Sequence, residues 1–159
     1  MSPMKLSDAE IEKLRRSGVR LDPHGVFWHE GAPVTHPGLA AAFFRWLDRN
    51  DDGRYVLRLD DKRFVYLDVD DAPLLLRSLR WEDGTAIGVF SDKTESAIDL
   101  STLRLQDGRA YLTAHKNLPA MIGPDAWSTL ADHLEEIDGE TYLIFTGDQE
   151  VRRKKIPSS

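Results

Sequence analysis

The stretch that decides the fold runs from His36 to Pro73 and reads HPGLAAAFFRWLDRNDDGRYVLRLDDKRFVYLDVDDAP. Pro37 suits the first position of a helix, where a missing backbone N–H costs nothing, and His36 or Thr35 is the expected cap. Apolar side chains then recur at three- and four-residue spacing, which predicts an amphipathic helix that buries one face. The apolar face consists of Leu39, Phe43, Trp46 and Leu47, with Phe44 beside them.

The residues after this helix alternate as strands do. An acidic turn that ends at Gly53 closes the helix, and Tyr55, Leu57 and Leu59 then share one face of a strand. Polar residues 60–63 form a turn into a second strand at 64–69. Because a helix with an apolar face must bury it on another element, the stretch predicts a helix packed on a hairpin.

The C-terminal half predicts a second copy of this pattern. Short strands at 103–105 and 110–112 correspond to those at 19–21 and 26–28, and a second apolar helix at 124–134 corresponds to the first. Gly25 and Gly108 lie 83 positions apart, and Pro37 and Pro124 lie 87 apart. This spacing indicates an internal repeat in which residues 19–60 correspond to 103–147. The alternative is that any two β-β-α-β units look alike.

The predicted fold class is therefore α+β, with two similar lobes, each a small curved antiparallel sheet with one amphipathic helix packed on it. A polar run at 91–96 is the expected boundary between them. The N-terminal lobe spans 1–92, beginning with a short helix at 7–18 after the capping box Ser7–Glu10, and the C-terminal lobe spans 97–155. Residues 156–159 are the expected flexible tail.

Composition excludes several classes of site and partner. The chain of 159 residues contains no cysteine, which excludes disulfides, thiolate zinc sites and cysteine nucleophiles. A formal net charge of −6 argues against a nucleic-acid partner, which would favour a basic patch. No apolar run approaches the ~20 residues of a membrane span, and the polar N-terminus does not resemble a secretory signal. We expect a cytoplasmic protein that does not bind membranes.

Neither a metal nor a cofactor is expected. The segment 48–53 matches the start of a calcium-binding loop, but the twelfth position, which needs a bidentate carboxylate, is Leu59. His24, His29 and His36 lack the i, i+4 spacing on one helix that would indicate a metal site.

Seven residues remain as candidates for binding a ligand or partner, and none is assigned a catalytic role. They are Trp28, His29, His36, Asp70, Asp71, His115 and Lys116. Adjacent carboxylates at a strand end point to opposite faces, which is poor geometry for a shared-proton dyad. One of the two aspartates is expected to cap the turn before Pro73 or to pair with an arginine such as Arg58.

The chain also resembles the bacterial "domain of unknown function 1285" family. The resemblance covers residues 19–82 well and residues 110–147 more weakly, and it rests on Asp22–Trp28, Gly31–Val34, Phe43-Phe44, Asp51–Tyr55 and Val69–Pro73. It implies a two-lobed α+β fold of repeated β-rich units. The family has no established activity. The resemblance suggests only a role in signalling.

These observations favour a non-enzymatic binding or adaptor module in signalling or regulation, with another protein as its partner. A small-molecule ligand and self-association are the other partner types left open. The alternative function is a small-molecule sensor or small enzyme with a polar site near His29, His36, Asp70 and Asp71. A cleft with converging polar groups would favour this alternative, and an exposed apolar patch would favour the module.

Overall fold

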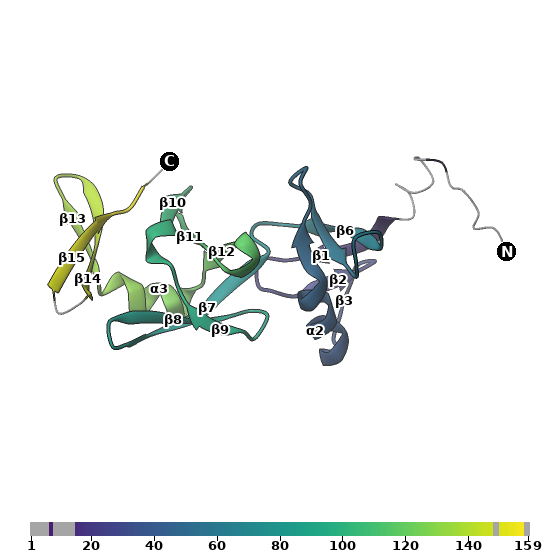
Figure 1. Ribbon diagram of the computed structural model, residues 1–159, viewed down its shortest axis with the longest axis horizontal. Coiled ribbons are helices and arrows are strands. Elements are labelled where there is room, and N and C mark those ends of the chain that lie inside the picture. The colour runs from purple at the N-terminus through teal and green to yellow at the C-terminus, as the bar shows by residue number, and fades with distance from the viewer. Residues whose placement is uncertain (1–6, 8–14, 148–149, 158–159) are drawn as a thin grey trace. The chain divides into compact units, whose positions relative to one another are not determined.

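The computed structural model describes Ser7, residues 15–147 and residues 150–157 (Figure 1). The chain divides into two compact units. Unit 1 contains the described residues up to Asp22 together with Val26–Asp70. Unit 2 contains Pro23–Gly25 and the described residues from Asp71 onward.

Unit 1 is a six-stranded sheet with one helix. Its elements are β1 (Arg16–Leu21), β2 (Phe27–His29), β3 (Ala32–Pro33), α2 (Pro37–Trp46), β4 (Leu47–Arg49), β5 (Tyr55–Arg58) and β6 (Phe64–Val69). The strands lie in the order β3-β2-β1-β6-β5-β4. The pairing of β1 with β6 is parallel, with Leu21 opposite Val69, and the other pairings are antiparallel.

Unit 2 contains a second six-stranded sheet and a separate three-stranded one. Its elements are β7 (Leu74–Glu82), β8 (Thr85–Phe90), β9 (Glu95–Ala97), the 3₁₀ turn η1 (Leu100–Thr102), β10 (Arg104–Gln106), β11 (Arg109–Thr113), the 3₁₀ turn η2 (His115–Asn117), β12 (Pro119–Ile122), α3 (Pro124–Ala131), β13 (Leu134–Ile137), β14 (Glu140–Gly147) and β15 (Glu150–Lys155). The larger sheet has the order β10-β11-β12-β7-β8-β9, and the pairing of β12 with β7 is parallel. Strands β13, β14 and β15 form the smaller sheet.

The two six-stranded sheets have the same topology, which confirms the predicted two-lobed repeat. In each, two three-stranded antiparallel meanders join where the first strand of one runs parallel to the last strand of the other. Strands β1 to β6 therefore correspond to β7 to β12. The predicted sheets were wholly antiparallel, and the parallel pair in each makes both sheets mixed.

The predicted correspondence of residues 19–60 with 103–147 is wrong. It equated β1 with β10, but β1 lies at the centre of its sheet and β10 at an edge. It also equated α2 with α3, whereas α2 precedes β4 and α3 follows the last strand of the second six-stranded sheet. The structural equivalent of α2 in chain order is the short turn η1.

Turn chemistry explains why the glycine spacing misled the repeat assignment. Four hairpins are closed by two-residue loops, at Glu30-Gly31, Asp83-Gly84, Asp107-Gly108 and Asp138-Gly139. Both residues of each loop have positive φ, as in a type I′ turn, which favours glycine at the second position. Gly108 closes such a hairpin, whereas Gly25 lies in the longer turn between β1 and β2, so the spacing of these two glycines does not mark equivalent positions of a repeat.

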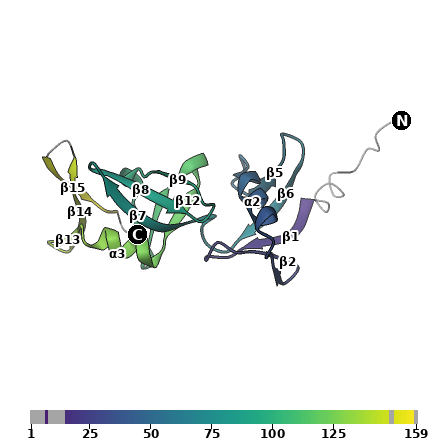
Figure 2. The ribbon, with the colours of Figure 1, turned by 90° about the horizontal axis from the view of Figure 1, so that it is seen from below.

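The helix of unit 1 begins as its sequence predicts, but Leu39 of the predicted apolar face is exposed. His36 caps α2, and its Nδ1 accepts a hydrogen bond from the Leu39 amide at 3.2 Å. The helix packs on the sheet (Figure 2) through Phe43 and Phe44, whose ring centroids lie 5.2 and 4.7 Å from that of Phe27. Leu47, directly after the helix, is buried. The aromatic face of α2 is thus anchored on one strand residue.

The unit boundary differs from the sequence-based boundary at 91–96. Residues 91–94 form the turn between β8 and β9, and residues 95–96 belong to β9. Ser91 is buried, and its Oγ accepts a hydrogen bond from the Leu75 amide at 3.0 Å. The chain divides instead between Asp70 and Asp71. Polarity alone marked residues 91–96 as a linker, whereas their hydrogen bonds hold them in a sheet.

Both ends of the chain also differ from expectation. Most of the predicted leading helix at 7–18 lies outside the described residues, and the chain from Arg16 onward is already β1. The predicted tail begins with Ile156, which is buried and donates its amide to the Thr141 carbonyl at 2.8 Å. Ile156 and Pro157 are therefore part of unit 2. In the described part of the chain, no helix has the length and apolar character that crossing a membrane requires.

We predict that Phe27→Ala lowers the free energy of unfolding by about 3–5 kcal/mol, because Phe27 is 1% exposed and its loss leaves a cavity under α2. Leu39→Ala is the control on the same helix. Leu39 is 42% exposed, and its replacement should cost less than about 1 kcal/mol. Urea denaturation followed by circular dichroism measures both. Equal costs for the two variants would show that α2 does not pack through Phe27.

Candidate functional site

The candidates in unit 1 use their polar atoms within the unit. The Trp28 indole Nε1 donates to the Asp22 carboxylate at 2.9 Å. His36 caps α2, and His29 Nε2 lies 4.0 Å from a Glu30 carboxylate oxygen. Trp28 and His29 lie on β2 and His36 precedes α2, and the hydrogen bonds of Trp28 and His36 serve the local fold.

The adjacent carboxylates at the unit boundary have different partners. Asp70 belongs to unit 1 and pairs with Arg20, while Asp71 belongs to unit 2. Asp71 accepts hydrogen bonds from the Tyr111 hydroxyl at 2.8 Å and from the Arg109 guanidinium at 3.0 Å. The expectation of an arginine partner is correct, but the suggested Arg58 pairs with Asp48 instead.

His115 and Lys116 lie in the turn η2 of unit 2. His115 Nε2 lies 2.5 Å from the Asp92 carboxylate, and His115 Nδ1 is buried without a hydrogen-bond partner among the described residues. Lys116 and Asn117 both adopt positive φ, near 56°, which is strained for non-glycine residues. The histidine ties this turn to the β8–β9 turn, and neither of its ring nitrogens is presented to solvent as a free base.

An apolar hollow of unit 2 lies elsewhere, between β11, β12 and the start of α3. We call it the Trp127 groove; it has a volume of about 650 Å³, and its apolar lining is Leu105, Ala110, Met121, Ile122, Pro124 and Trp127. Trp127 and Met121 are only half-buried, so the hollow presents apolar surface to the outside. Volumes of 300–1,000 Å³ are typical of ligand sites.

Close packing of α3 on the sheet places Trp127 in this groove. The Gly123 amide donates to the Leu76 carbonyl at 2.9 Å, and a Cβ at Gly123 would lie only 3.0 Å from that oxygen. Ala126 and Leu130 fill the buried face of the helix. Trp127, which follows Ala126, therefore lies at the edge of this contact.

Arg109 supplies the main charge of the Trp127 groove. Its side chain is 59% exposed, and its guanidinium contacts Asp71, which is 19% exposed. Arg109 and Tyr111 occupy alternate positions of β11 and so face the same way. Asp71 and Tyr111 also line a smaller polar hollow of about 320 Å³. Arg109 thus stands where the apolar groove meets a polar network.

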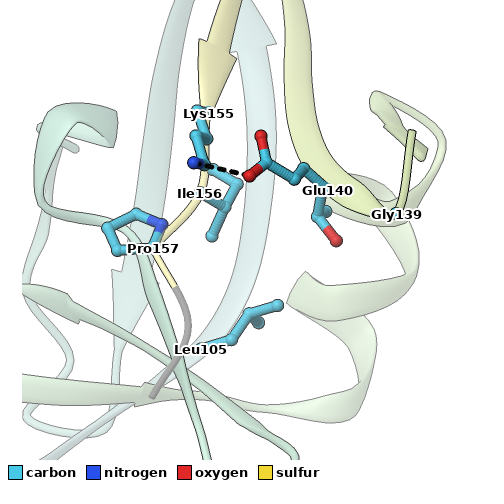
Figure 3. Close-up of a pocket in the computed structure, with 7 residues that line it drawn as sticks. Leu105, Gly139, Glu140, Lys155, Ile156 and Pro157 are labelled. Atoms are coloured by element: carbon cyan, nitrogen blue, oxygen red, sulfur yellow. Dashed lines mark ion pairs between the residues drawn. The ribbon is translucent and has the colours of Figure 1, made fainter. Parts of the chain in front are cut away.

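Figure 3 shows a further hollow of unit 2, of about 660 Å³, beside the small sheet. Glu140 and Lys155 point toward each other across it and form an ion pair of 2.8 Å, with Ile156 close to the lysine. Leu105 lines both this hollow and the Trp127 groove. Lys155, the last residue of the basic run at 152–155, is therefore engaged within the unit.

The apolar spacing of the helix predicted at 124–134 puts Trp127 on its buried face, and Arg109 and Tyr111 are not among the candidates predicted from the sequence. Spacing on α3 gives no means of telling a half-exposed tryptophan from a buried one, because both lie on the apolar side. Arg109 and Tyr111 acquire their role from Asp71, a residue distant in the sequence. Their alternation on one strand was the only available signal, and it is common in exposed strands.

Comparisons with known proteins identify the fold. No family model and no curated protein matches the sequence. The chain is similar to the crystal structure of a DUF1285 family protein from Silicibacter pomeroyi DSS-3, with a TM-score of 0.71, 19% identity, and coverage of 89% of this chain and 81% of that one. A DUF1285 family protein from Shewanella baltica OS155 gives a TM-score of 0.62 and 21% identity over 74% of this chain and 93% of that one. The predicted family resemblance is confirmed at the level of the fold, and neither description states a function.

The polar network predicts a pH dependence at Tyr111. Burial raises the pKa of the Tyr111 hydroxyl above its ordinary value, and the hydrogen bond to Asp71 raises it further. Because the folded-state pKa exceeds the unfolded one, this contribution to stability is complete below about pH 10 and is lost as the pH rises through the folded-state pKa.

An ultraviolet titration of the four tyrosines should therefore show Tyr111 ionising after an ordinary exposed tyrosine, and Tyr111→Phe should remove that step. Asp71→Asn should shift the step only partly downward, because burial is the larger cause. If no late step disappears in Tyr111→Phe, the network does not protect this hydroxyl.

Proposed function

We propose that this protein is a non-enzymatic binding module and that the Trp127 groove is the surface with which it holds a protein partner. The observation that carries the proposal is the combination of half-exposed Trp127 and Met121 in a hollow of about 650 Å³. Tryptophan, methionine and arginine are the residue types enriched at protein interfaces, and this groove contains all three. A signalling or regulatory adaptor would act through such a surface.

The arrangement of polar groups supports binding over catalysis. A general base must reach a substrate proton with a free lone pair. The described candidates instead direct their polar atoms to local partners: His36 to α2, His115 to Asp92, and Asp71 to Tyr111. Within the described chain no group of three or more histidine or acidic side chains could hold a metal ion.

The alternative, a small-molecule sensor, has one observation in its favour. Asp71 and Tyr111 line the polar hollow of about 320 Å³, which also contains Arg104 and Gln106. That hollow could recognise a small polar ligand. The Trp127 groove is larger and more apolar, and its surface is of the kind that a protein segment covers.

We predict that short peptides selected from a displayed random library on the intact protein depend on Trp127. Trp127→Ala should weaken their binding roughly tenfold or more, because a tryptophan in an interface pocket is a typical hot spot. Trp28→Ala, at the tryptophan that Asp22 holds in unit 1, is the matched control and should leave binding unchanged. Fluorescence anisotropy of labelled peptides measures the dissociation constants.

A second variant guards against a folding defect in Trp127→Ala. Met121 is half-buried on β12, and Met121→Gln places a neutral polar amide in the groove with little change in side-chain volume. It should also weaken binding, while circular dichroism shows both variants to be folded. Peptides that bind both variants as tightly as the native protein would contradict the proposal, as would peptides whose binding depends on Trp28.

A further inference from the structure

Arg109 is held so that it can exchange partners. Its contact with Asp71 runs through one terminal nitrogen, 3.0 Å from one carboxylate oxygen. A guanidinium has five N–H donors and binds a carboxylate best through two parallel hydrogen bonds. Arg109 also interacts with the Tyr111 side chain, but its one hydrogen bond to Asp71 and its 59% exposure leave guanidinium donors for a second carboxylate.

Asp71 does not depend on Arg109 alone. Its other oxygen accepts the Tyr111 hydroxyl at 2.8 Å, and Tyr111 is held in place on β11 between β10 and β12. If Arg109 moves to another anion, Asp71 keeps a hydrogen bond and remains partly exposed. The exchange therefore leaves no carboxylate buried without a partner, which would be costly.

The charge around the groove favours an anion. Among the residues that the structure describes, no acidic side chain lines the Trp127 groove, and Arg109 is the one charged side chain in its lining. The whole chain nevertheless carries a formal charge of −6. When Arg109 leaves Asp71, it offers a positive group that selects partners by charge as well as by shape.

We propose that the Trp127 groove recognises an acidic amphipathic peptide segment, which packs apolar side chains on Trp127 and Met121 and offers a carboxylate to Arg109 in place of Asp71. This inference rests on the proposed function and adds the chemistry of the partner. Asp71 competes with the carboxylate of the segment for Arg109 and so lowers the affinity of the groove for the segment. When the segment is bound, Asp71 keeps its hydrogen bond to Tyr111.

The test uses the peptides selected for Trp127-dependent binding, resynthesised with each acidic residue replaced by its amide. Replacement of the acidic residue that pairs with Arg109 should weaken binding to the native protein about fivefold, the range expected for a partly exposed ion pair. The same replacement should have no effect on Arg109→Gln, which gives a double-mutant cycle that isolates this pair. Asp71→Asn should tighten binding of the acidic peptide two- to fivefold, roughly the value of the competing pair.

The opposite signs for Arg109→Gln and Asp71→Asn separate this proposal from a structural effect, because damage to the fold would weaken binding in both. The acidic-segment proposal is wrong if the Trp127-dependent peptides carry no acidic residue, or if their amide forms bind equally well. The proposal that the groove binds a protein partner would be unaffected by that result. Peptides that bind independently of Trp127 would overturn the groove function itself. Octanoate serves as a probe for a small-molecule ligand. If it displaces the peptides and binds more tightly than they do, the ligand is a small amphipathic acid and the proposal is overturned.

Discussion

The parallel pair of strands at the centre of each six-stranded sheet is the constraint on which the rest of the structure depends. In unit 1 it joins β1 to β6, and in unit 2 it joins β7 to β12. Strand β6 leads directly through Asp70–Pro73 into β7, so the central pair of one sheet is connected to the central pair of the next. The Asp70 amide donates to the Leu21 carbonyl, which extends the pairing to the last residue of unit 1.

The same constraint places the candidate groove. Because β12 pairs with β7, the chain leaves the sheet at Ile122 beside Leu76, and the Gly123 amide bonds to the Leu76 carbonyl. Helix α3 starts there and packs along β7 with Leu130 buried. Trp127 is consequently held at the edge of this packing, next to β12 and β11. The groove is a product of the topology, and its apolar lining comes from segments that pair only in the folded sheet.

Local features of the fold could be predicted from the sequence, whereas pairings between distant segments could not. The cap at His36 and the hairpin turns follow from residue types and spacing within a few positions. The parallel pairing of Leu21 with Val69 has no local signature, and similar glycine spacing in turns of different length made two unrelated segments look equivalent. The boundary was missed for a similar reason: Asp70 and Asp71 appear as one polar pair, but Arg20 and Arg109 hold them in different units.

The candidate site shows the same limit. Trp28, His29 and His36 stand out in the sequence because polar and aromatic residues cluster there, yet in the structure their contacts serve the fold of unit 1. Trp127 reads as an ordinary core residue, and only the packing of Ala126 and Leu130 shows that it lies at an edge. The candidate site depends on the exposure of Trp127 and on an ion pair between residues distant in the sequence, and a single sequence predicts neither.

The most direct test of the account is the nuclear magnetic resonance signal of the indole N–H groups, because the four tryptophans report from different elements of the two units. Trp28 and Trp46 lie on β2 and α2 of unit 1, and Trp81 and Trp127 lie on β7 and α3 of unit 2. Addition of a selected acidic peptide should shift the Trp127 signal and leave those of Trp28 and Trp46 in place. A shift confined to Trp28 or Trp46, with Trp127 unmoved at saturation, would contradict the assignment of the binding surface to unit 2.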